Sequence, residues 1–307
     1  MTDRHPILVT GAAGLIGRVV VERLVAAGRP VLPVDRVPAS ADAGYVVTTA
    51  ELTDVHRLHE LVASGIDGII HCGGISGPAV GRDHPAGVAG VNVGGTVTLL
   101  EAARLCRVRR FVFCSSIVAY GATPAGLDVV DEAAPLTATA DIYGASKAAA
   151  DLLVRAYGEQ HGLDIRIGRI GWVYGPRRST PSVLGSMMRS CLAGRPLTVE
   201  HDGTFPLQLV HVDDVATGLL TLYDSEPAGG RAFNITGGTQ LSVTALADLV
   251  VAAIPGAEIG FTPGTPLRAD RQGLFSVVAL QGLGWRPRVT LTEGIARYAD
   301  WLRLHPF

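Results

Sequence analysis

Tyr143 and Lys147 have the residue types and the spacing for acid–base chemistry. They are four residues apart in the stretch YGASK, so a helix would place both on one face. A tyrosine with an ordinary pKa of about 10 is a poor base at neutral pH, but a nearby ammonium group favours its phenolate form. Upstream, Ser116 ends an apolar segment, and its hydroxyl group could hold a substrate oxygen. Each residue alone could be an exposed helical side chain or a strand-end cap. Together they predict hydride transfer at an alcohol, with Tyr143 as the general base.

A glycine-rich turn predicts a dinucleotide site. The segment TGAAGLIG (residues 10–17) follows an apolar strand and opens a helix. Gly11 permits the turn, Gly14 lets the backbone approach a pyrophosphate, and Gly17 allows close helix–strand packing. The next expected strand ends at Asp35, whose carboxylate can accept hydrogen bonds from both adenosine ribose hydroxyls and would repel a 2′-phosphate. NAD is therefore predicted over NADP, although the adjacent Arg36 could accommodate a phosphate.

Alternating strand and helix segments must position these residues. Short apolar runs separated by helix-period segments predict a doubly wound parallel α/β (Rossmann) sheet. We expect an NAD-binding domain over residues 1–171 and a smaller, partly interleaved substrate lobe over 172–307, with part of 205–235 returning to the first domain. The expected strands are Ile7–Thr10, Pro30–Asp35, Tyr45–Thr48, Gly68–His71, Arg110–Cys114 and Asp164–Arg169, and the expected helices are Leu15–Ala27, Val55–Ala63, Pro85–Cys106 and Tyr143–His161.

Composition excludes several classes of protein. The chain has 307 residues with 26 basic and 28 acidic side chains, so it lacks the positive charge of a nucleic-acid binder. No uninterrupted apolar run has the roughly 18–20 residues that a membrane span needs. Because the N-terminus runs directly into an expected strand, we expect no signal peptide. The four cysteines show no paired spacing and are interpreted as reduced core residues. We expect a cytoplasmic protein without a metal site.

Beyond these local patterns, the sequence resembles the extended short-chain dehydrogenase/reductases of the NAD-dependent epimerase/dehydratase family over nearly its whole length. The resemblance implies that Asp54 contacts the adenine, that Gly73 and Gly74 line the pyrophosphate, and that Lys147 binds the nicotinamide ribose. It also implies a homodimer formed by the helices near 85–106 and 143–161. The matching segments are the glycine loop, Asp35, residues 52–54, 71–74, 92–96 and 115–121, Tyr143 with Lys147, Arg169, residues 174–176 and 211–216.

From the residues and the resemblance together, we predict one set of residues for each part of the site. The catalytic residues are Ser116, Tyr143 and Lys147. The NAD site comprises Gly11, Ala13, Gly14, Leu15, Ile16, Asp35, Arg36, Leu52, Asp54, Cys72, Gly73, Gly74, Asn92, Cys114, Ser115, Tyr143, Lys147 and Ile170. The substrate site comprises Ser76, Ser116, Trp172, Arg177, Arg178 and Arg268.

Departures from the family pattern bear on the net reaction. Dehydratases of this family carry an Asp-Glu pair directly after the catalytic hydroxyl residue, whereas this chain has Ile117 and Val118, which cannot move protons. We therefore expect no dehydration. Nucleotide-sugar epimerases usually carry an Asn and an Arg that contact the substrate diphosphate, and here those positions are Trp172 and Leu207.

Two short segments, 71–76 and 169–171, are similar to those of uronate and other sugar-acid dehydrogenases. An arginine of the 177–178 pair would then bind a carboxylate. The first hypothesis is thus an NAD-dependent oxidoreductase acting on a secondary alcohol of a sugar or sugar acid. A nucleotide-sugar epimerase with tightly bound NAD is the second, and a non-catalytic NAD-sensing regulator is the third.

Overall fold

Seven parallel strands form the central sheet of the protein. The computed structural model describes residues 5–77, 79–124, 127–137, 141–200, 203–226, 231–262 and 273–305. Within them the sheet has the order β12-β7-β5-β4-β1-β2-β3, which is that of a doubly wound α/β fold. Its strands are β1 (Ile7–Thr10), β2 (Val31–Asp35), β3 (Thr48–Thr49), β4 (Gly68–His71), β5 (Arg110–Ser116), β7 (Ile165–Ile170) and β12 (Ala232–Ile235).

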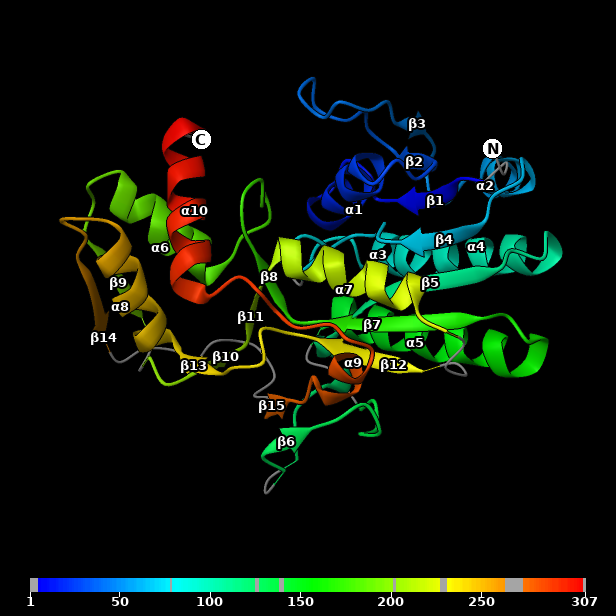
Figure 1. The fold of residues 1–307 in the computed structure, drawn as a ribbon. Helices are drawn as coiled ribbons and strands as arrows, with labels where there is room; N and C mark the ends of the chain where they lie inside the picture. Colours follow the sequence, from blue (N-terminus) through cyan, green and yellow to red (C-terminus); the bar gives the residue numbers. More distant parts are fainter. Residues whose placement is uncertain are drawn as a thin grey trace.

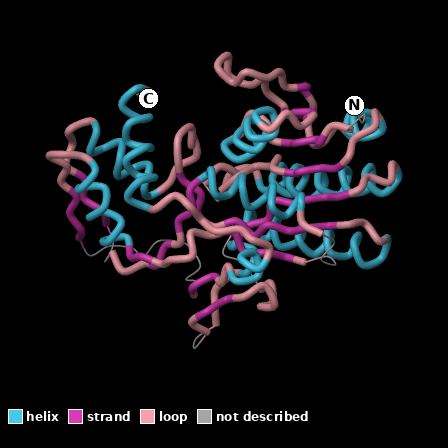
Figure 2. Tube along the Cα trace, in the orientation of Figure 1, coloured by secondary structure: helices cyan, strands magenta, loops and turns pink. Residues whose placement is uncertain are grey.

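Helices cover both faces of this sheet (Figure 1). Strands buried on both sides, such as β4 and β5, need apolar helix faces above and below, and two separate apolar cores fill these spaces. The first core contains side chains of α1 (Leu15–Ala26), α7 (Val212–Asp224) and α9 (Val278–Gly282). The second contains those of α2 (Val55–Ala63), α4 (Gly95–Leu105) and α5 (Ile142–His161). Figure 2 shows the resulting layers of helix and strand.

Local capping explains where the helices of the site begin. Asp54 accepts a hydrogen bond from the Arg57 amide at the start of α2. Asp141 accepts one from the Gly144 amide at 2.8 Å, which begins α5 just before Tyr143. The same helix ends at Gly162, whose φ of +67° suits a glycine better than a residue with a side chain.

The single helix expected over Pro85–Cys106 is divided in three. α3 (Pro85–Ala89) leads through a π-helical turn (Gly90–Gly94) into α4. This stretch, Pro85–Leu105, is the one helix of the described ranges that is long and apolar enough to cross a membrane, where we expected no such segment. It packs on α2 and α5, and 44% of its most apolar window is buried inside the protein. A core helix of a globular protein meets the same criteria.

A second lobe lies beyond the carboxyl ends of the sheet strands (Figure 1). It has its own apolar core, in which Leu207 and Tyr298 are fully buried. Its elements are β8 (Trp172–Tyr174), α6 (Val183–Leu192), β9 (Leu197–Glu200), β10 (Pro206–Leu207), β13 (Leu241–Ser242), α8 (Val243–Ala253), β14 (Ile259–Thr262) and α10 (Leu291–Leu304). β9 pairs with β14, and β10 with β13.

Segments between these elements return to the sheet. β11 (Leu209–His211) pairs with β8 and leads into α7, and β12 joins the edge of the central sheet beside β7. A short pair, β6 (Val129–Val130) with β15 (Leu274–Phe275), packs under Ile117 and Tyr120. The chain thus crosses between its two parts several times, which couples the lobe to the sheet.

Two single residues deserve separate description. Helix α7 begins at Val212, where the His211 ring accepts a hydrogen bond from the Asp213 amide. The Asp214 carboxylate accepts hydrogen bonds from the backbone amides of residues 288 and 289, which fixes the segment that leads into α10. Of the four cysteines, which are all free, Cys106 is exposed at the end of α4 rather than in the core. Helix α4 stops there, so no neighbouring element covers it.

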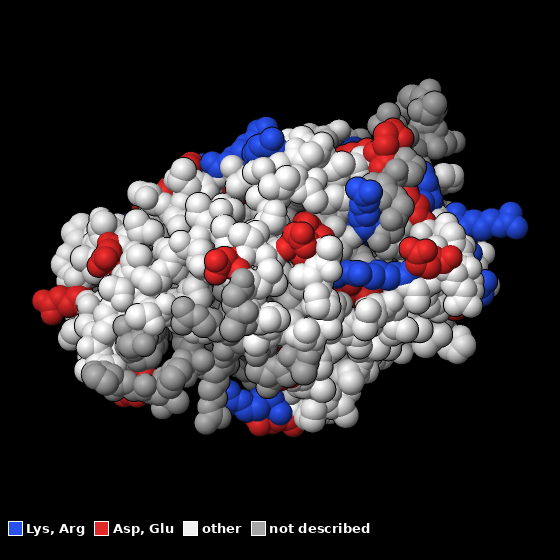
Figure 3. Space-filling view, turned by 90° about the horizontal axis from the view of Figure 1, so that it is seen from below, with Lys and Arg blue, Asp and Glu red and all other residues white. Residues whose placement is uncertain are grey.

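Charged side chains of both signs mix on the surface seen in Figure 3. Lys and Arg lie among Asp and Glu on this face, and large areas carry neither. This distribution agrees with the net charge of −2.

Candidate active site

The phosphate loop lies against the end of β4. A Cβ atom at Gly11, whose φ is +67°, would be 2.8 Å from the Cys72 carbonyl carbon and the Gly73 nitrogen. At Gly17 it would lie 2.1 Å from the Gly11 oxygen. Gly14 precedes α1 without a side-chain cap and is exposed, so the first amides of the helix stay open to a ligand. Gly11 and Gly17 thus permit backbone contacts that a side chain would block, and the open start of α1 at Gly14 fits the pyrophosphate of NAD.

Asp35, at the end of β2, is held beside this loop. Its carboxylate accepts hydrogen bonds from the Ala13 amide at 3.0 Å and the Val37 amide at 3.3 Å. Each carboxylate oxygen has further acceptor capacity. The group is therefore oriented for a ribose hydroxyl donor. Arg36 is exposed, and Asp54 is exposed as well while it caps α2.

Lys147 is anchored at the end of β5. Its ammonium group is buried, donates to the Cys114 carbonyl at 2.8 Å, and lies 5.1 Å from the centre of the Phe113 ring. Tyr143 precedes it by one turn of α5 and is partly exposed. Ser116 ends β5, where its hydroxyl contacts the Ile170 carbonyl at 3.4 Å. The structure thus places all three predicted catalytic residues at the carboxyl edge of the sheet.

A buried hydrogen-bond chain connects the phosphate-loop strand to α5. The Thr96 hydroxyl donates its one proton to the Asn92 carbonyl. It can therefore only accept a hydrogen bond from His71 Nε2, at 3.1 Å. His71 Nδ1 then accepts a hydrogen bond from the Thr10 hydroxyl at 2.6 Å. The Thr10 hydroxyl oxygen in turn accepts one from the Gly73 amide. Burial, with a smaller contribution from the charge of Lys147, lowers the pKa of His71 to about 3, which keeps the ring neutral.

Asn92 completes this chain. It lies in the π-helical turn, a feature often found at functional sites. Its side-chain oxygen accepts a hydrogen bond from the Ile75 amide at 2.8 Å. Its side-chain nitrogen donates hydrogen bonds to the Ile75 carbonyl and to the Ser146 hydroxyl. Ser146 in turn donates to the Tyr143 carbonyl at 2.7 Å. Sequence reasoning assigned Asn92 to the cofactor site but missed its bond to the catalytic helix.

A buried ion pair connects helix α5 to the central sheet. Asp151, one turn beyond Lys147, accepts hydrogen bonds from Arg169 on β7 and from the Ser115 hydroxyl on β5. Both members of the Asp151–Arg169 pair are fully buried. Tyr143, Lys147 and Asp151 are thus spaced four residues apart along α5, and the last two are hydrogen-bonded to β5.

The two predicted substrate arginines have different surroundings. Arg177, with a φ of +70°, pairs with Asp42 at 2.5 Å, and Asp42 also contacts Ser40 and Arg18. Arg177 lines a cavity of about 340 Å³ beside the phosphate loop, together with Ala13, Gly14, Leu15, Arg18 and residues 37–40. The structure thus places it on the cofactor side.

Arg178 points elsewhere and donates to the carbonyls of Val173, Thr180 and Pro181. Burial lowers its pKa, and the nearby Tyr298 and Tyr143 raise it by a smaller amount. No carboxylate among the residues that the structure describes forms an ion pair with it. Trp172 is partly buried against Phe205. Ser76 is exposed, and Arg268 lies outside the described residues.

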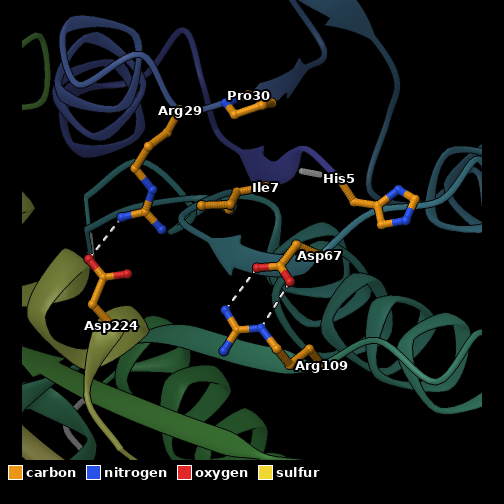
Figure 4. A pocket seen from close by; sticks show the side chains of 7 residues that line it. All are labelled: His5, Ile7, Arg29, Pro30, Asp67, Arg109 and Asp224. Atoms are coloured by element: carbon orange, nitrogen blue, oxygen red, sulfur yellow. Dashed lines mark hydrogen bonds and ion pairs between the residues drawn. The ribbon is translucent and has the colours of Figure 1, made fainter. Parts of the chain in front are cut away.

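A larger cavity, of about 560 Å³, lies at the opposite end of the sheet (Figure 4). It is lined by residues at the amino ends of the strands, among them Ile7, Asp67 and Arg109. Its charged side chains pair with each other, Arg109 with Asp67 and Arg29 with Asp224. It is separate from the catalytic residues.

Comparison with known proteins identifies the family of this chain. The family described as "NAD dependent epimerase/dehydratase family" matches residues 7–236. The chain belongs to this family. It is 32% identical to a dTDP-glucose 4,6-dehydratase of Streptomyces antibioticus, over 97% of this chain and 92% of that one. It is 31% identical to a UDP-glucose 4-epimerase of Mycolicibacterium smegmatis, over 96% and 98%.

Among solved structures, the UDP-glucose 4-epimerase of Thermus thermophilus in complex with NAD superposes with a TM-score of 0.86. It is 28% identical, and the match covers 97% of this chain and 99% of that one. Fold class, family and NAD dependence are thereby confirmed. The relatives include an epimerase and a dehydratase, so the expectation that dehydration does not occur stays a prediction.

Proposed function

We propose that the chain oxidises a secondary alcohol of a sugar or sugar-acid substrate, with Tyr143 as the general base. The observation that carries this proposal is the buried bond between Lys147 Nζ and the Cys114 carbonyl, which holds an ammonium group one helical turn from Tyr143. NAD, when bound, supplies the hydride acceptor. Tyr143 takes the hydroxyl proton, Ser116 holds the alcohol oxygen, and Lys147 holds the ribose and stabilises negative charge on the phenol.

Arg178 supports a substrate with an anionic group. Its guanidinium donates to neutral carbonyls and forms no ion pair within the described ranges, and Tyr143 is near enough to it to raise its pKa. Its charge is therefore available to an anionic group of the substrate. A carboxylate or phosphate could share two of its N–H groups. Apolar Ile117, which is buried beside Tyr120, and Val118 provide no acid–base pair for loss of water.

A second candidate function is epimerisation of a nucleotide sugar with NAD retained through the cycle. The Asp42–Arg177 ion pair favours it, because the pair joins the loop after β2 to the loop after β8 beside the phosphate-loop cavity. Such a bridge would slow release of the dinucleotide.

Turnover by the Tyr143→Phe variant tests the proposal. Free sugars, uronates, UDP-glucose and dTDP-glucose are each incubated with the enzyme and NAD, while NADH absorbance and sugar interconversion are followed. We expect turnover to fall by about 10²–10⁴-fold while NAD still binds. Tyr157→Phe, on the same helix but hydrogen-bonded to Glu101, is the matched control and should keep full activity.

The products distinguish the two candidate reactions. Free NADH identifies a dehydrogenase, and sugar interconversion without free NADH identifies an epimerase. Unchanged turnover in Tyr143→Phe would contradict both functions.

A further inference from the structure

Two cysteines meet at the strand ends that carry the cofactor site. Cys72 directly follows β4, and Cys114 lies in β5 at the next position after the His71–Phe113 pair of the register. The Cys114 thiol donates to Cys72 Sγ at a distance of 3.2 Å. Neighbouring strands lie about 4.8 Å apart, which is within the Cα separation of about 4.4–6.8 Å that a disulfide spans. The two thiols can therefore be joined, provided that the sulfurs move from 3.2 Å to the bond length of about 2.05 Å, a shift that the two strand ends must share.

We propose that Cys72 and Cys114 are a site of reversible oxidation, at which a peroxide forms a disulfide that weakens binding of the dinucleotide. Neither the catalytic scheme nor the phosphate loop uses these two thiols. Cys72 is partly exposed whereas Cys114 is 4% exposed, so Cys72 is the residue that meets the oxidant.

The chemistry balances with hydrogen peroxide as the oxidant. The Cys72 thiolate attacks one peroxide oxygen, the O–O bond breaks, and a sulfenic acid and one water result. The Cys114 thiol then attacks the sulfenic sulfur, the S–O bond breaks, and a second water leaves as the S–S bond forms. Two thiols are oxidised, and one peroxide is reduced to two waters. The hydrogen bond with the Cys114 thiol raises the pKa of Cys72, so the thiolate fraction grows, and this oxidation becomes faster, as pH rises.

The backbone of both cysteines explains why a disulfide would affect the cofactor. The Cys114 carbonyl accepts the Lys147 ammonium group at 2.8 Å. The Cys72–Gly73 backbone packs so closely on Gly11 that a Cβ atom at Gly11 would lie 2.8 Å from the Cys72 carbonyl carbon. A bond that draws the sulfurs together moves both strand ends, and with them the lysine anchor and the seat of the phosphate loop.

The remaining cysteines offer a clean background for the test. Cys106 is exposed at the end of α4, and Cys191 is buried in the core of the second lobe. A Cys106→Ser, Cys191→Ser protein therefore keeps only the proposed pair. Adding Cys72→Ala or, separately, Cys114→Ala to this background leaves a single thiol as the matched control.

The experiment treats the two-cysteine protein with hydrogen peroxide and measures free thiols, intact mass and the NAD dissociation constant. We expect loss of both thiols with a mass decrease of about 2 Da, and a dissociation constant raised by about tenfold. Dithiothreitol should restore all three. The single-cysteine controls should lose their thiol only with gain of oxygen or by joining two chains.

Each other result overturns the proposal. These results are persistence of both thiols, a mass gain without pairing, a disulfide between chains, or an internal disulfide that leaves the dissociation constant unchanged. None of these measurements needs a substrate, so an error in the proposed reaction would not be mistaken for failure of the redox pair.

Discussion

Both carboxylate oxygens of Asp151 accept hydrogen bonds from the Arg169 guanidinium group, at 3.0 and 3.1 Å. Neither side chain is exposed. Asp151 also pairs with Arg155, but Arg169 has no other carboxylate partner among the described residues, so its buried charge depends on Asp151 for compensation. Asp151 also holds Ser115 of β5 at 3.0 Å. The pair therefore locks the catalytic helix α5 to the two strands that end at the active site.

We predict that Asp151→Asn lowers the free energy of unfolding by about 3–5 kcal/mol, because the Arg169 charge would remain buried without its partner. Urea denaturation followed by circular dichroism measures this loss. Asp300→Asn breaks an exposed pair with Arg303 and is the control, for which we expect little change. A loss no greater than that of the control would show that the buried pair does not stabilise the fold.

The neutral state of His71 predicts a dependence of stability on pH. Its folded pKa of about 3 lies below the ordinary histidine value of 6.5. As pH falls below 6.5, the unfolded chain binds a proton that the folded chain does not, so stability decreases. The loss attributable to His71 is about 1.5 kcal/mol between roughly pH 6.5 and 5. Denaturant titrations over this range should show a shallower decrease for His71→Gln than for the unaltered protein, and parallel curves would contradict the buried neutral ring.

The sequence predicted those parts of the fold and site whose signals are local. The glycine loop, Asp35, Tyr143 and Lys147 each belong to a short motif beside one strand or helix end. In a parallel sheet the carboxyl ends of the strands meet at one edge, so order along the chain was enough to bring these motifs together.

Contacts between distant segments were not predictable in this way. Arg177 and Asp42 are 135 residues apart, and no local pattern identifies an arginine that reaches back to the cofactor side. The π-helical turn at Asn92 differs from an α-helix by one hydrogen-bond register, which the apolar periodicity of 85–106 does not record. The Cys72–Cys114 contact likewise depends on the pairing of β4 with β5.

Asp35→Ala should weaken NAD binding by more than about tenfold. The variant loses the acceptor for the ribose hydroxyls and also the bonds that orient the Ala13 and Val37 amides. Isothermal titration of the purified protein with NAD measures the change. Asp83→Ala, a substitution on an exposed turn, is the control. An unchanged dissociation constant in Asp35→Ala would show that this carboxylate does not bind the ribose.

Lys147→Met separates the role of the lysine from that of Tyr143. Methionine keeps much of the apolar length of the side chain beside Phe113 but cannot donate to the Cys114 carbonyl or to a ribose hydroxyl. We therefore expect both a higher NAD dissociation constant and a turnover reduced by about 10²-fold or more, whereas Tyr143→Phe should reduce turnover alone. Binding titrations and steady-state rates of the two variants, measured at saturating NAD, test this difference. If Lys147→Met bound NAD as tightly as the unaltered protein, the lysine would act on the tyrosine only, and its assignment to the cofactor site would be wrong.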